Sequence, residues 1–308
     1  MSTIAARLKK TDPSLAPAVL PRETAGFSVT PALFAKFQRL IHQETGIWLG
    51  DSKSALLCGR LSRRLRALGL TTMDQYYDLV TLPAQHEERV SMIDAITTNE
   101  TRFFREPRQF EFLEWRAIPR WRAEAERGSR PRAIQIWSAG CSSGEEPYSL
   151  AMLLARHLLG ERGWNVTILA TDISTRMLAH ARTGIYSITK SADIPEPLLK
   201  DYMLKGIAKQ DGQMKVMPEI QTVVEFQKLN LSQGPYPPEA HFDLIFCRNV
   251  LIYFDHQSKQ QVVEHLTRCL ARTGLLIVGQ AENLSGMSSQ LRSLVPAVYT
   301  RAGEQSGF

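Results

Sequence analysis

Apolar residues recur at helical spacing near the start of the chain. Thr30 and Pro31 form a typical helix start, an N-cap residue followed by proline at the first helical position, and Gly46 can end the same helix. The apolar residues between them fall three and four positions apart and share one face: Leu33, Phe34, Phe37 and Ile41. The pattern therefore predicts an amphipathic helix over about residues 31–45.

Three further helices are predicted before residue 98. One runs from about 52 to 68, the next opens with the capping box of Thr72 and Gln75, and the last spans about 86–97. Residues 27–97 are therefore expected to form an all-helical N-terminal domain. Residues 98–132 are expected to be a linker with a connecting helix, which ends in the Arg-, Gly- and Pro-rich sequence RGSRPR.

The pattern changes after residue 132. Short apolar runs rich in β-formers alternate with helical or irregular stretches, and they are AIQIWSA (133–139), NVTILATD (165–172), TVVEFQKLN (222–230), FDLIFCRN (242–249) and LLIVGQA (275–281). This alternation predicts an α/β domain over 133–301, with a mostly parallel sheet covered on both faces. The segment VPAVYTR (295–301) could add an antiparallel edge strand.

One connection in this domain is too long for a simple crossover. Residues 184–220 hold a possible helix, PEPLLKDYMLKG, and a turn followed by a strand, QDGQMKVM. We therefore expect an inserted subdomain over about 185–222.

Composition describes an ordinary globular protein. Of the 308 residues, 44% are hydrophobic and 22% charged, and no apolar run approaches the ~18 residues that span a bilayer. Residues 1–26 lack the apolar core of a secretory signal, so we expect a disordered lead-in and a cytoplasmic protein without membrane insertion. The net charge of +6 favours an acidic partner, which could be nucleic acid, a membrane surface or a protein.

The four cysteines give no sign of a metal site. Cys58, Cys141, Cys247 and Cys269 form no CxxC pair, and metal-ligand spacing is absent. Reduced, buried thiols are expected.

The most informative stretch is IWSAGCSSGEEPYSL, residues 136–150, which is typical of a strand, a small-residue loop and a helix start. The loop is not G-x-G-x-x-G and has no Walker lysine, so a phosphate ligand is poorly supported. Glu145 and Glu146 instead place carboxylates at the helix start, and Asp172 ends the next β-run, where an acid can accept hydrogen bonds from ribose hydroxyls.

Each of these acids has a structural alternative. Glu145 and Glu146 could merely favour the helix dipole, and Asp172 could cap the following helix. Together in one βαβ unit they favour a nucleoside that carries positive charge, and S-adenosylmethionine fits, with its ribose, adenine, sulfonium and amino group.

Five blocks in this order resemble the CheR-type chemoreceptor glutamate methyltransferases, over about residues 30–300. The blocks are TTNETRFFRE (97–106), WSAGCSSGEEPYS (137–149), ATDIS (170–174), FCRNVLIYFD (246–255) and GLLIVGQAEN (274–283). The resemblance implies a helical N-terminal domain, a Rossmann-like S-adenosylmethionine-dependent catalytic domain and a small β-subdomain inserted in it. These match the divisions expected above.

The resemblance also implies site residues. Arg105 and Tyr253 are implied at the reacting centre, although Tyr253 could be only an amphipathic core aromatic. Residues implied to contact the donor, or its demethylated product S-adenosylhomocysteine, are Asn99, Thr101, Arg105, Glu145, Asp172, Asn230, Leu231, Arg248 and Asn249. No metal is implied.

The implied reaction moves the methyl group of S-adenosylmethionine to a glutamate oxygen, forming a methyl ester. A glutamate with a pKa of about 4.3 is already ionised at neutral pH, so alignment and a dry site matter more than a strong base.

The implied acceptor is the acidic helical bundle of a chemoreceptor's cytoplasmic domain. Arg60, Arg63 and Arg64 share one stripe of the second predicted helix, in a stretch from Lys53 to Arg66 with no acid, and could dock it. A charged stripe is also a common solvated face. The inserted subdomain could bind a receptor's C-terminal tail.

Three other functions were weighed. A nucleic-acid methyltransferase would suit the basic charge, but amino-methylating enzymes usually carry [D/N/S]-P-P-[Y/F/W] where this chain reads CRNVLIYF, and Cys247 in an apolar strand is more typical of a core residue than of a nucleophile. A nicotinamide-dependent oxidoreductase lacks its glycine fingerprint. A non-catalytic donor-binding sensor stays open.

Overall fold

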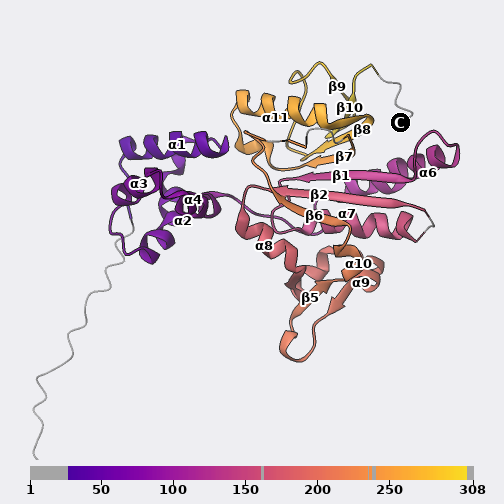
Figure 1. The fold of residues 1–308 in the computed structure, drawn as a ribbon, viewed down its shortest axis with the longest axis horizontal. Helices are drawn as coiled ribbons and strands as arrows, with labels where there is room; N and C mark the ends of the chain where they lie inside the picture. The colour runs from indigo at the N-terminus through magenta and orange to yellow at the C-terminus, as the bar shows by residue number, and fades with distance from the viewer. Residues whose placement is uncertain (1–26, 161–162, 235, 238–240, 304–308) are drawn as a thin grey trace, which may run out of the picture.

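The N-terminal part of the chain folds as a four-helix unit (Figure 1). The computed structural model describes residues 27–303 apart from 161–162, 235 and 238–240, so the expected lead-in over 1–26 lies outside the described residues. The helices of this unit are α1 (Pro31–Thr45), α2 (Ser54–Ala67), α3 (Met73–Thr81) and α4 (His86–Ile96), with a 3-10 turn, η1 (Asp51–Lys53), before α2.

The helix ends follow the capping residues in the sequence. The Thr30 hydroxyl accepts a hydrogen bond from the Leu33 N–H, and Gly46 ends α1 in the left-handed region with φ 72°. Thr72 and Gln75 form the expected capping box of α3. These predictions are confirmed. The apolar faces of the helices meet in one core of their own, which includes Phe37, Ile41, Leu57, Leu61, Leu65, Tyr76 and Met92.

A connecting helical segment leads from this unit to the sheet. It consists of α5 (Pro107–Phe112), a π-helical turn, η2 (Leu113–Ala117), and α6 (Ile118–Glu126). Phe110, Leu113 and Trp121 bury this segment against the sheet core, so it belongs to the second unit and not to the four-helix unit.

The second unit is built on a seven-stranded sheet in the order β6-β2-β1-β7-β8-β10-β9. Strands β6, β2, β1, β7 and β8 run parallel, and β10 and β9 add antiparallel. The strands are β1 (Ala133–Ala139), β2 (Asn165–Asp172), β6 (Val224–Lys228), β7 (Phe242–Cys247), β8 (Leu270–Val278), β9 (Leu291–Val295) and β10 (Val298–Arg301). The expected Rossmann-like α/β architecture is therefore present.

Helices cover both faces of this sheet (Figure 1). Helices α5 to α8 pack in the core that contains Ile134 and Ile136 of β1. Helix α11 packs in the other core, which contains Trp137 and Ala139 of the same strand. The covering helices are α7 (Glu145–Leu154), continued by a π-helical turn, η3 (Ala155–Leu159), α8 (Thr175–Thr183) and α11 (His256–Cys269). Alternate side chains of β1 therefore feed two cores, as a buried parallel strand requires.

A small antiparallel sheet is inserted between α8 and β6 and projects from the main sheet (Figure 1). Its strand order is β3-β5-β4. The insertion comprises β3 (Ile185–Ser187), η4 (Ile188–Asp193), α9 (Glu196–Tyr202), β4 (Met203–Lys205), η5 (Ala208–Gln210), β5 (Gln213–Val216) and α10 (Pro218–Gln221).

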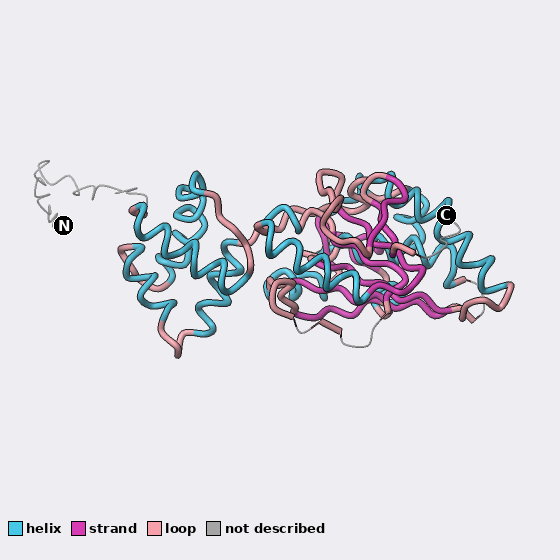
Figure 2. The backbone as a smooth tube through the Cα atoms, turned by 90° about the horizontal axis from the view of Figure 1, so that it is seen from above, coloured by secondary structure: helices cyan, strands magenta, loops and turns pink. Residues whose placement is uncertain are grey.

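The four-helix unit lies to one side of the unit that contains the sheet (Figure 2), and contacts between them are made at the end of α1. The Trp48 N–H donates to the Tyr253 carbonyl at 2.9 Å, and His42 Nε2 lies 2.5 Å from Asp255 Oδ2. The Asn230 side-chain amide donates to the Glu44 carbonyl at 2.8 Å. Among the described residues, no helix is long and apolar enough to cross a membrane.

Candidate active site

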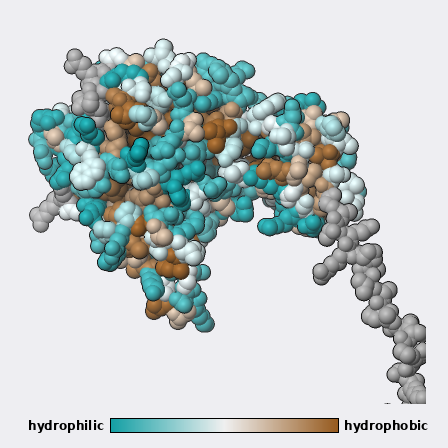
Figure 3. Space-filling model, turned by 180° about the vertical axis from the view of Figure 1, so that it is seen from behind, coloured by the Kyte–Doolittle hydropathy of each residue, from teal (hydrophilic) through white to brown (hydrophobic). Residues whose placement is uncertain are grey.

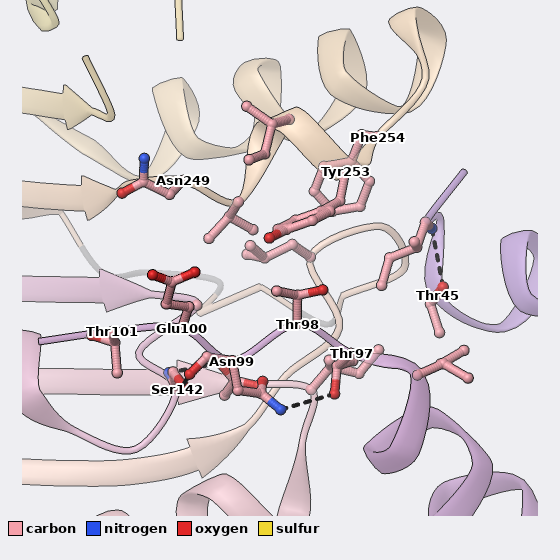
Figure 4. Close-up of a pocket in the computed structure, with 18 of the residues that line it drawn as sticks. Thr45, Thr97, Thr98, Asn99, Glu100, Thr101, Ser142, Asn249, Tyr253 and Phe254 are labelled. Carbon is pink, nitrogen blue, oxygen red and sulfur yellow. Dashed lines mark hydrogen bonds between the residues drawn. The ribbon is translucent and has the colours of Figure 1, made fainter. Parts of the chain in front are cut away.

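A cavity of about 400 Å³ lies where the parallel strands end and the helical unit meets them. Its walls come from the loops after β1, β2, β6 and β7, from the linker over 96–105, and from the segment between α1 and α2. Loops at the carboxyl ends of parallel strands form the usual ligand site of open α/β sheets, and the volume falls within the range of small-molecule pockets. We call it the interdomain cavity (Figure 4).

Except for Glu145, the residues implied to bind the donor or react line this cavity. They are Asn99, Thr101, Arg105, Asp172, Asn230, Leu231, Arg248, Asn249 and Tyr253. In Figure 4, Asn99 and Thr101 lie across the cavity from Tyr253 and Phe254. Residues from four separate segments of the sequence thus converge on one space.

Glu145 and Glu146 face different partners. The Glu145 side chain is fully buried and accepts from the Ser143 hydroxyl at 2.6 Å and from the Lys190 ammonium group of the insertion. Glu146 lines the interdomain cavity instead. Consecutive helical residues point about 100° apart, so only one of the two acids can face the cavity, and in this structure it is Glu146.

Glu146 is held at the cavity wall by two donors. The Ser138 hydroxyl donates to its Oε1 at 2.7 Å, and Arg248 Nη1 lies 3.3 Å from its Oε2. Burial raises the pKa of Glu146, and the opposing effect of the Arg248 guanidinium is smaller. A cationic ligand stabilises the ionised form of a carboxylate with a raised pKa, because the ligand's positive charge offsets the cost of burying the carboxylate's negative charge.

Asp172 is organised by the backbone around it. Its Oδ2 accepts from the Ser142 N–H and its Oδ1 from the Ser174 N–H, each at 2.8 Å. The helix α8 is capped by Ser174, so Asp172 is not that helix's N-cap. Burial raises the pKa of Asp172. A carboxylate has about four acceptor positions, so these backbone bonds leave capacity for a ribose hydroxyl.

Arg248 ties the loop after β7 to the linker. Its guanidinium is almost fully buried, lies 3.3 Å from Glu106 Oε2 and donates to the Arg105 carbonyl. It therefore holds the backbone of Arg105 beside the cavity. The Arg105 side chain donates to the Glu100 carbonyl at 2.9 Å.

Tyr253 reaches the cavity from a short turn, η6 (Leu251–Tyr253), that follows the loop after β7. Asn249 in this loop adopts the left-handed region with φ 58°, which is rare for a residue other than glycine. The hydrogen bond from Trp48 to the Tyr253 carbonyl fixes the turn against the helical unit.

Sequence reasoning missed the wall that the helical unit contributes. Thr45, Trp48, Leu49, Lys53 and Leu56 line the cavity, and Trp48 keeps 52% of its surface exposed. No local pattern marks these residues, because their position depends on how the two units dock. An exposed tryptophan beside a helix-ending glycine was the one available signal.

The three arginines of the expected docking stripe have different surroundings. Arg60 lines the cavity and donates to the Ile96 carbonyl and to the Thr98 hydroxyl. Arg64 is ion-paired with Glu88 of α4, and this acid from another helix compensates its charge. Arg63 is exposed.

All four cysteines are buried and free, as expected. Cys247 is fully buried in β7 and does not line the interdomain cavity. Burial raises the pKa of its thiol well above the ordinary value, so the thiolate that a cytosine-attacking enzyme needs is disfavoured.

The residues present fit S-adenosylmethionine. Asp172 can accept from ribose hydroxyls, Glu146 can face positive charge, and Leu229 and Leu231 offer apolar surface to the adenine. The part of the chain that the structure describes contains no group of three His, Cys, Asp or Glu residues suited to a metal. Fold and site together define a Rossmann-like S-adenosylmethionine-dependent methyltransferase.

Comparison with known proteins specifies the family. Residues 99–299 match the model of the CheR methyltransferase SAM binding domain, and residues 32–97 match the CheR methyltransferase all-alpha domain. The chain belongs to the CheR methyltransferase family, whose members act in chemotaxis.

Several curated relatives share most of its length. The chain is 35% identical to the chemotaxis protein methyltransferase of Salmonella typhimurium, covering 96% of this chain and 98% of the relative. It is 36% identical to that of Escherichia coli (91% and 94%) and 37% identical to chemotaxis protein methyltransferase 2 of Pseudomonas aeruginosa (90% and 95%).

Proposed function

We propose that the protein transfers a methyl group from S-adenosylmethionine to glutamate side chains of chemoreceptor cytoplasmic domains, forming methyl esters in the cytoplasm. The observation that carries this proposal is the interdomain cavity, in which the buried Asp172 and the partly buried Glu146 share one space with Tyr253 and Arg105. The names of the curated relatives support a chemotaxis substrate.

In this proposal the sheet side of the cavity binds the donor. Asp172 accepts from the ribose hydroxyls, Glu146 balances the positive charge, and Leu229 and Leu231 flank the adenine. The remaining donor contacts come from the linker and the loops after β6 and β7: Asn99, Thr101, Arg105, Asn230, Arg248 and Asn249. Whether Glu145 reaches the donor, as the family resemblance implies, or Glu146 does so in its place is testable.

The chemistry needs little acid–base help. S-adenosylmethionine supplies an electrophilic methyl group on its sulfonium. A receptor glutamate is ionised at neutral pH, so the chain's residues have to align it and exclude water. Tyr253 orients the reacting groups across the cavity, and Arg105 attracts the incoming carboxylate.

The helical unit supplies the docking face for the receptor. Lys53 and Arg60 lie at the cavity and Arg63 is exposed on the same helix, so a positive surface borders the site where an acidic bundle has to present its glutamate. Arg64 contributes less, since Glu88 already pairs with it.

The insertion offers a separate apolar surface for a receptor's C-terminal tail. Leu204 and Ile207 are 43% and 76% exposed, and apolar residues are visible on the projecting subdomain in Figure 3. Covering such side chains is favourable in proportion to the apolar area removed from water. This surface lies on a different part of the molecule from the cavity, as a tether requires.

The test is methyl transfer from tritiated donor to receptor cytoplasmic fragments and, in parallel, to oligonucleotides. We expect label in the receptor fragments that is released by mild base, as carboxyl methyl esters are. Label in oligonucleotides, or none in any receptor fragment, would refute the proposal. Donor binding without transfer to any acceptor would indicate the non-catalytic sensor.

A further inference from the structure

The loop that carries Asn249 and Tyr253 is held by a carboxylate that lies outside the cavity lining. Glu282 follows β8 and is 3% exposed. Its Oε2 accepts from the Asn249 N–H at 2.8 Å and from the Gly279 N–H at 2.7 Å, and its Oε1 accepts from the Ile252 N–H at 3.2 Å. One side chain thus binds the backbone before the loop's turn, within the turn and at the end of β8.

The loop has two features that make such an anchor necessary. Asn249 occupies the left-handed region with φ 58°, which asparagine adopts more readily than other non-glycine residues but which the surroundings still have to select. The neighbouring strand end leaves no space: a Cβ on Gly279 would lie 2.7 Å from Asn249 Nδ2 and 2.9 Å from Glu282 Oε2.

The anchor is specific for a carboxylate. Three backbone donors point at its two oxygens, and among the described residues no lysine or arginine lies within ion-pair distance of Glu282. The peptide dipoles therefore balance its charge. A glutamine would turn an NH₂ group toward a backbone N–H, which replaces an acceptor by a donor and leaves a buried donor unsatisfied.

We infer that Glu282 is a positioning residue for methyl transfer: it fixes the Asn249–Tyr253 loop so that Tyr253 faces the donor. This inference rests on the proposed function, in which Tyr253 orients the reacting groups. Glu282 itself need touch neither donor nor acceptor. Its effect belongs to turnover because a displacement of about 1 Å at a reacting group can cost 100-fold in rate.

The experiment compares Glu282→Gln with the matched control Asp243→Asn. Asp243 is the second residue of β7, near the end of the strand far from the loop. It also accepts from a backbone N–H, that of Gln135 at 2.9 Å, and from Arg130 at 2.6 Å. Calorimetry with S-adenosylhomocysteine counts the folded binding sites in each preparation. Turnover is then expressed per binding site, so unfolded protein does not affect the value.

For Glu282→Gln, we expect kcat per binding site for receptor fragments to fall about 10- to 100-fold, with the receptor KM within about threefold of wild type. Asp243→Asn should lose stability and keep its kcat per site. An unchanged kcat per site in Glu282→Gln would overturn the inference, because a purely structural carboxylate changes only the number of folded sites.

Hydrogen exchange provides a readout that needs no substrate. The amides of Asn249 and Ile252 should exchange faster in Glu282→Gln and at the wild-type rate in Asp243→Asn. If the wild-type protein methylates no receptor, the proposed function fails, and exchange still decides whether Glu282 holds the loop: unchanged protection of both amides would overturn the anchor, and faster exchange would support it.

Discussion

Asp172, Glu146 and Glu100 are the carboxylates that line the interdomain cavity, and the proposed function assigns the first two to a ligand with hydroxyls and positive charge. Backbone N–H groups hold Asp172, whereas Ser138 and Arg248 hold Glu146. Burial raises the pKa of both. Each acid is thus fixed in place, and a carboxylate oxygen with one donor can accept another, which suits a ligand that brings donors and charge.

The first residue-scale prediction concerns Asp172→Ala. Two ribose hydroxyls would lose a charged acceptor, so we expect donor affinity to fall by about 1–3 kcal/mol, roughly 5- to 150-fold. Calorimetry with S-adenosylhomocysteine measures the loss. Asp211→Ala, an exposed aspartate of the insertion, is the control and should bind as wild type does. Undiminished affinity in Asp172→Ala would exclude a ribose contact.

The second prediction separates the adjacent glutamates by pH. An acid attracts a cationic donor only when ionised, and the pKa of Glu146 in the free protein lies above the ordinary value of about 4.3. Donor affinity should therefore be highest above this raised pKa and fall as the pH drops through it. Glu146→Gln should bind the donor more weakly than wild type and should lose the part of this pH dependence that Glu146 causes, while the part that Asp172 causes, whose pKa is also raised, remains.

Glu145→Gln is the comparison for this titration. If Glu146 is the donor contact, Glu145→Gln should retain the fall in affinity at acid pH and lose less affinity at neutral pH. The reverse result would return the contact to Glu145 and show that the Lys190 ion pair opens on donor binding.

A third prediction concerns Tyr253→Phe. Removing the hydroxyl should leave donor affinity within about twofold and lower kcat by roughly tenfold or more, since the group is assigned to alignment in the transition state. Single-turnover methylation of a receptor fragment measures this. Full turnover in Tyr253→Phe would remove the residue from the reacting centre.

The residues differ in how far sequence could assign them. Asp172 was accessible because it ends a β-run, and strand ends in a parallel sheet meet at the ligand edge. The sequence could not tell whether Glu145 or Glu146 faces the cavity, because the answer depends on where the helix begins to within one residue. Trp48 and Glu282 act through distant backbone groups, the Tyr253 carbonyl and the Asn249 N–H, and no spacing in the sequence reports such contacts.

At the scale of elements, local chemistry fixed most helices and the central strands. The Thr30 cap, the Gly46 stop and the Thr72 capping box each appear where the sequence placed them. The edge strand β9 (Leu291–Val295) was not anticipated, because its residues show no regular alternation of buried and exposed positions.

The insertion contacts the loop after β1 and the start of α7 directly. The Tyr186 hydroxyl of β3 donates to the Ser143 carbonyl at 2.8 Å, and Lys190 pairs with Glu145 at the start of α7. The insertion therefore helps to hold the glycine-rich loop after β1 in place.

The element-scale prediction tests the positive face of α2. Arg63 is the stripe residue to change, because Arg60 and Arg64 hold internal partners. Arg63→Glu should lower receptor methylation at low substrate by roughly two- to fivefold, the effect of an exposed charge, and should leave donor affinity unchanged. Added salt should weaken the wild-type rate, since exposed charges are screened within about 10 Å at 0.1 M.

The control for this face is Arg268→Glu, the same charge change on an exposed arginine of α11. It should methylate receptor at the wild-type rate. Equal effects of Arg63→Glu and Arg268→Glu would mean that only net charge matters, and no effect of Arg63→Glu would leave the stripe a solvated face.

At the scale of the whole molecule, the active site exists only because two units dock. Thr45 to Leu56 of the helical unit close one wall of the interdomain cavity, and contacts such as His42 with Asp255 and Trp48 with Tyr253 hold that wall in place. The same unit carries the positive α2. In the proposed function, acceptor docking and donor enclosure would therefore take place side by side on the helical unit.

The most direct measurement is the identity of the methylated atom. A receptor cytoplasmic fragment is incubated with the protein and S-adenosylmethionine, and the modified peptides are sequenced by mass spectrometry before and after mild base. The account predicts a single methyl group on glutamate side chains of the fragment's helices, lost after base as methanol, and absent when Asp172→Ala replaces the wild-type protein at low donor. A base-stable methyl group on lysine, arginine or any other side chain would contradict it.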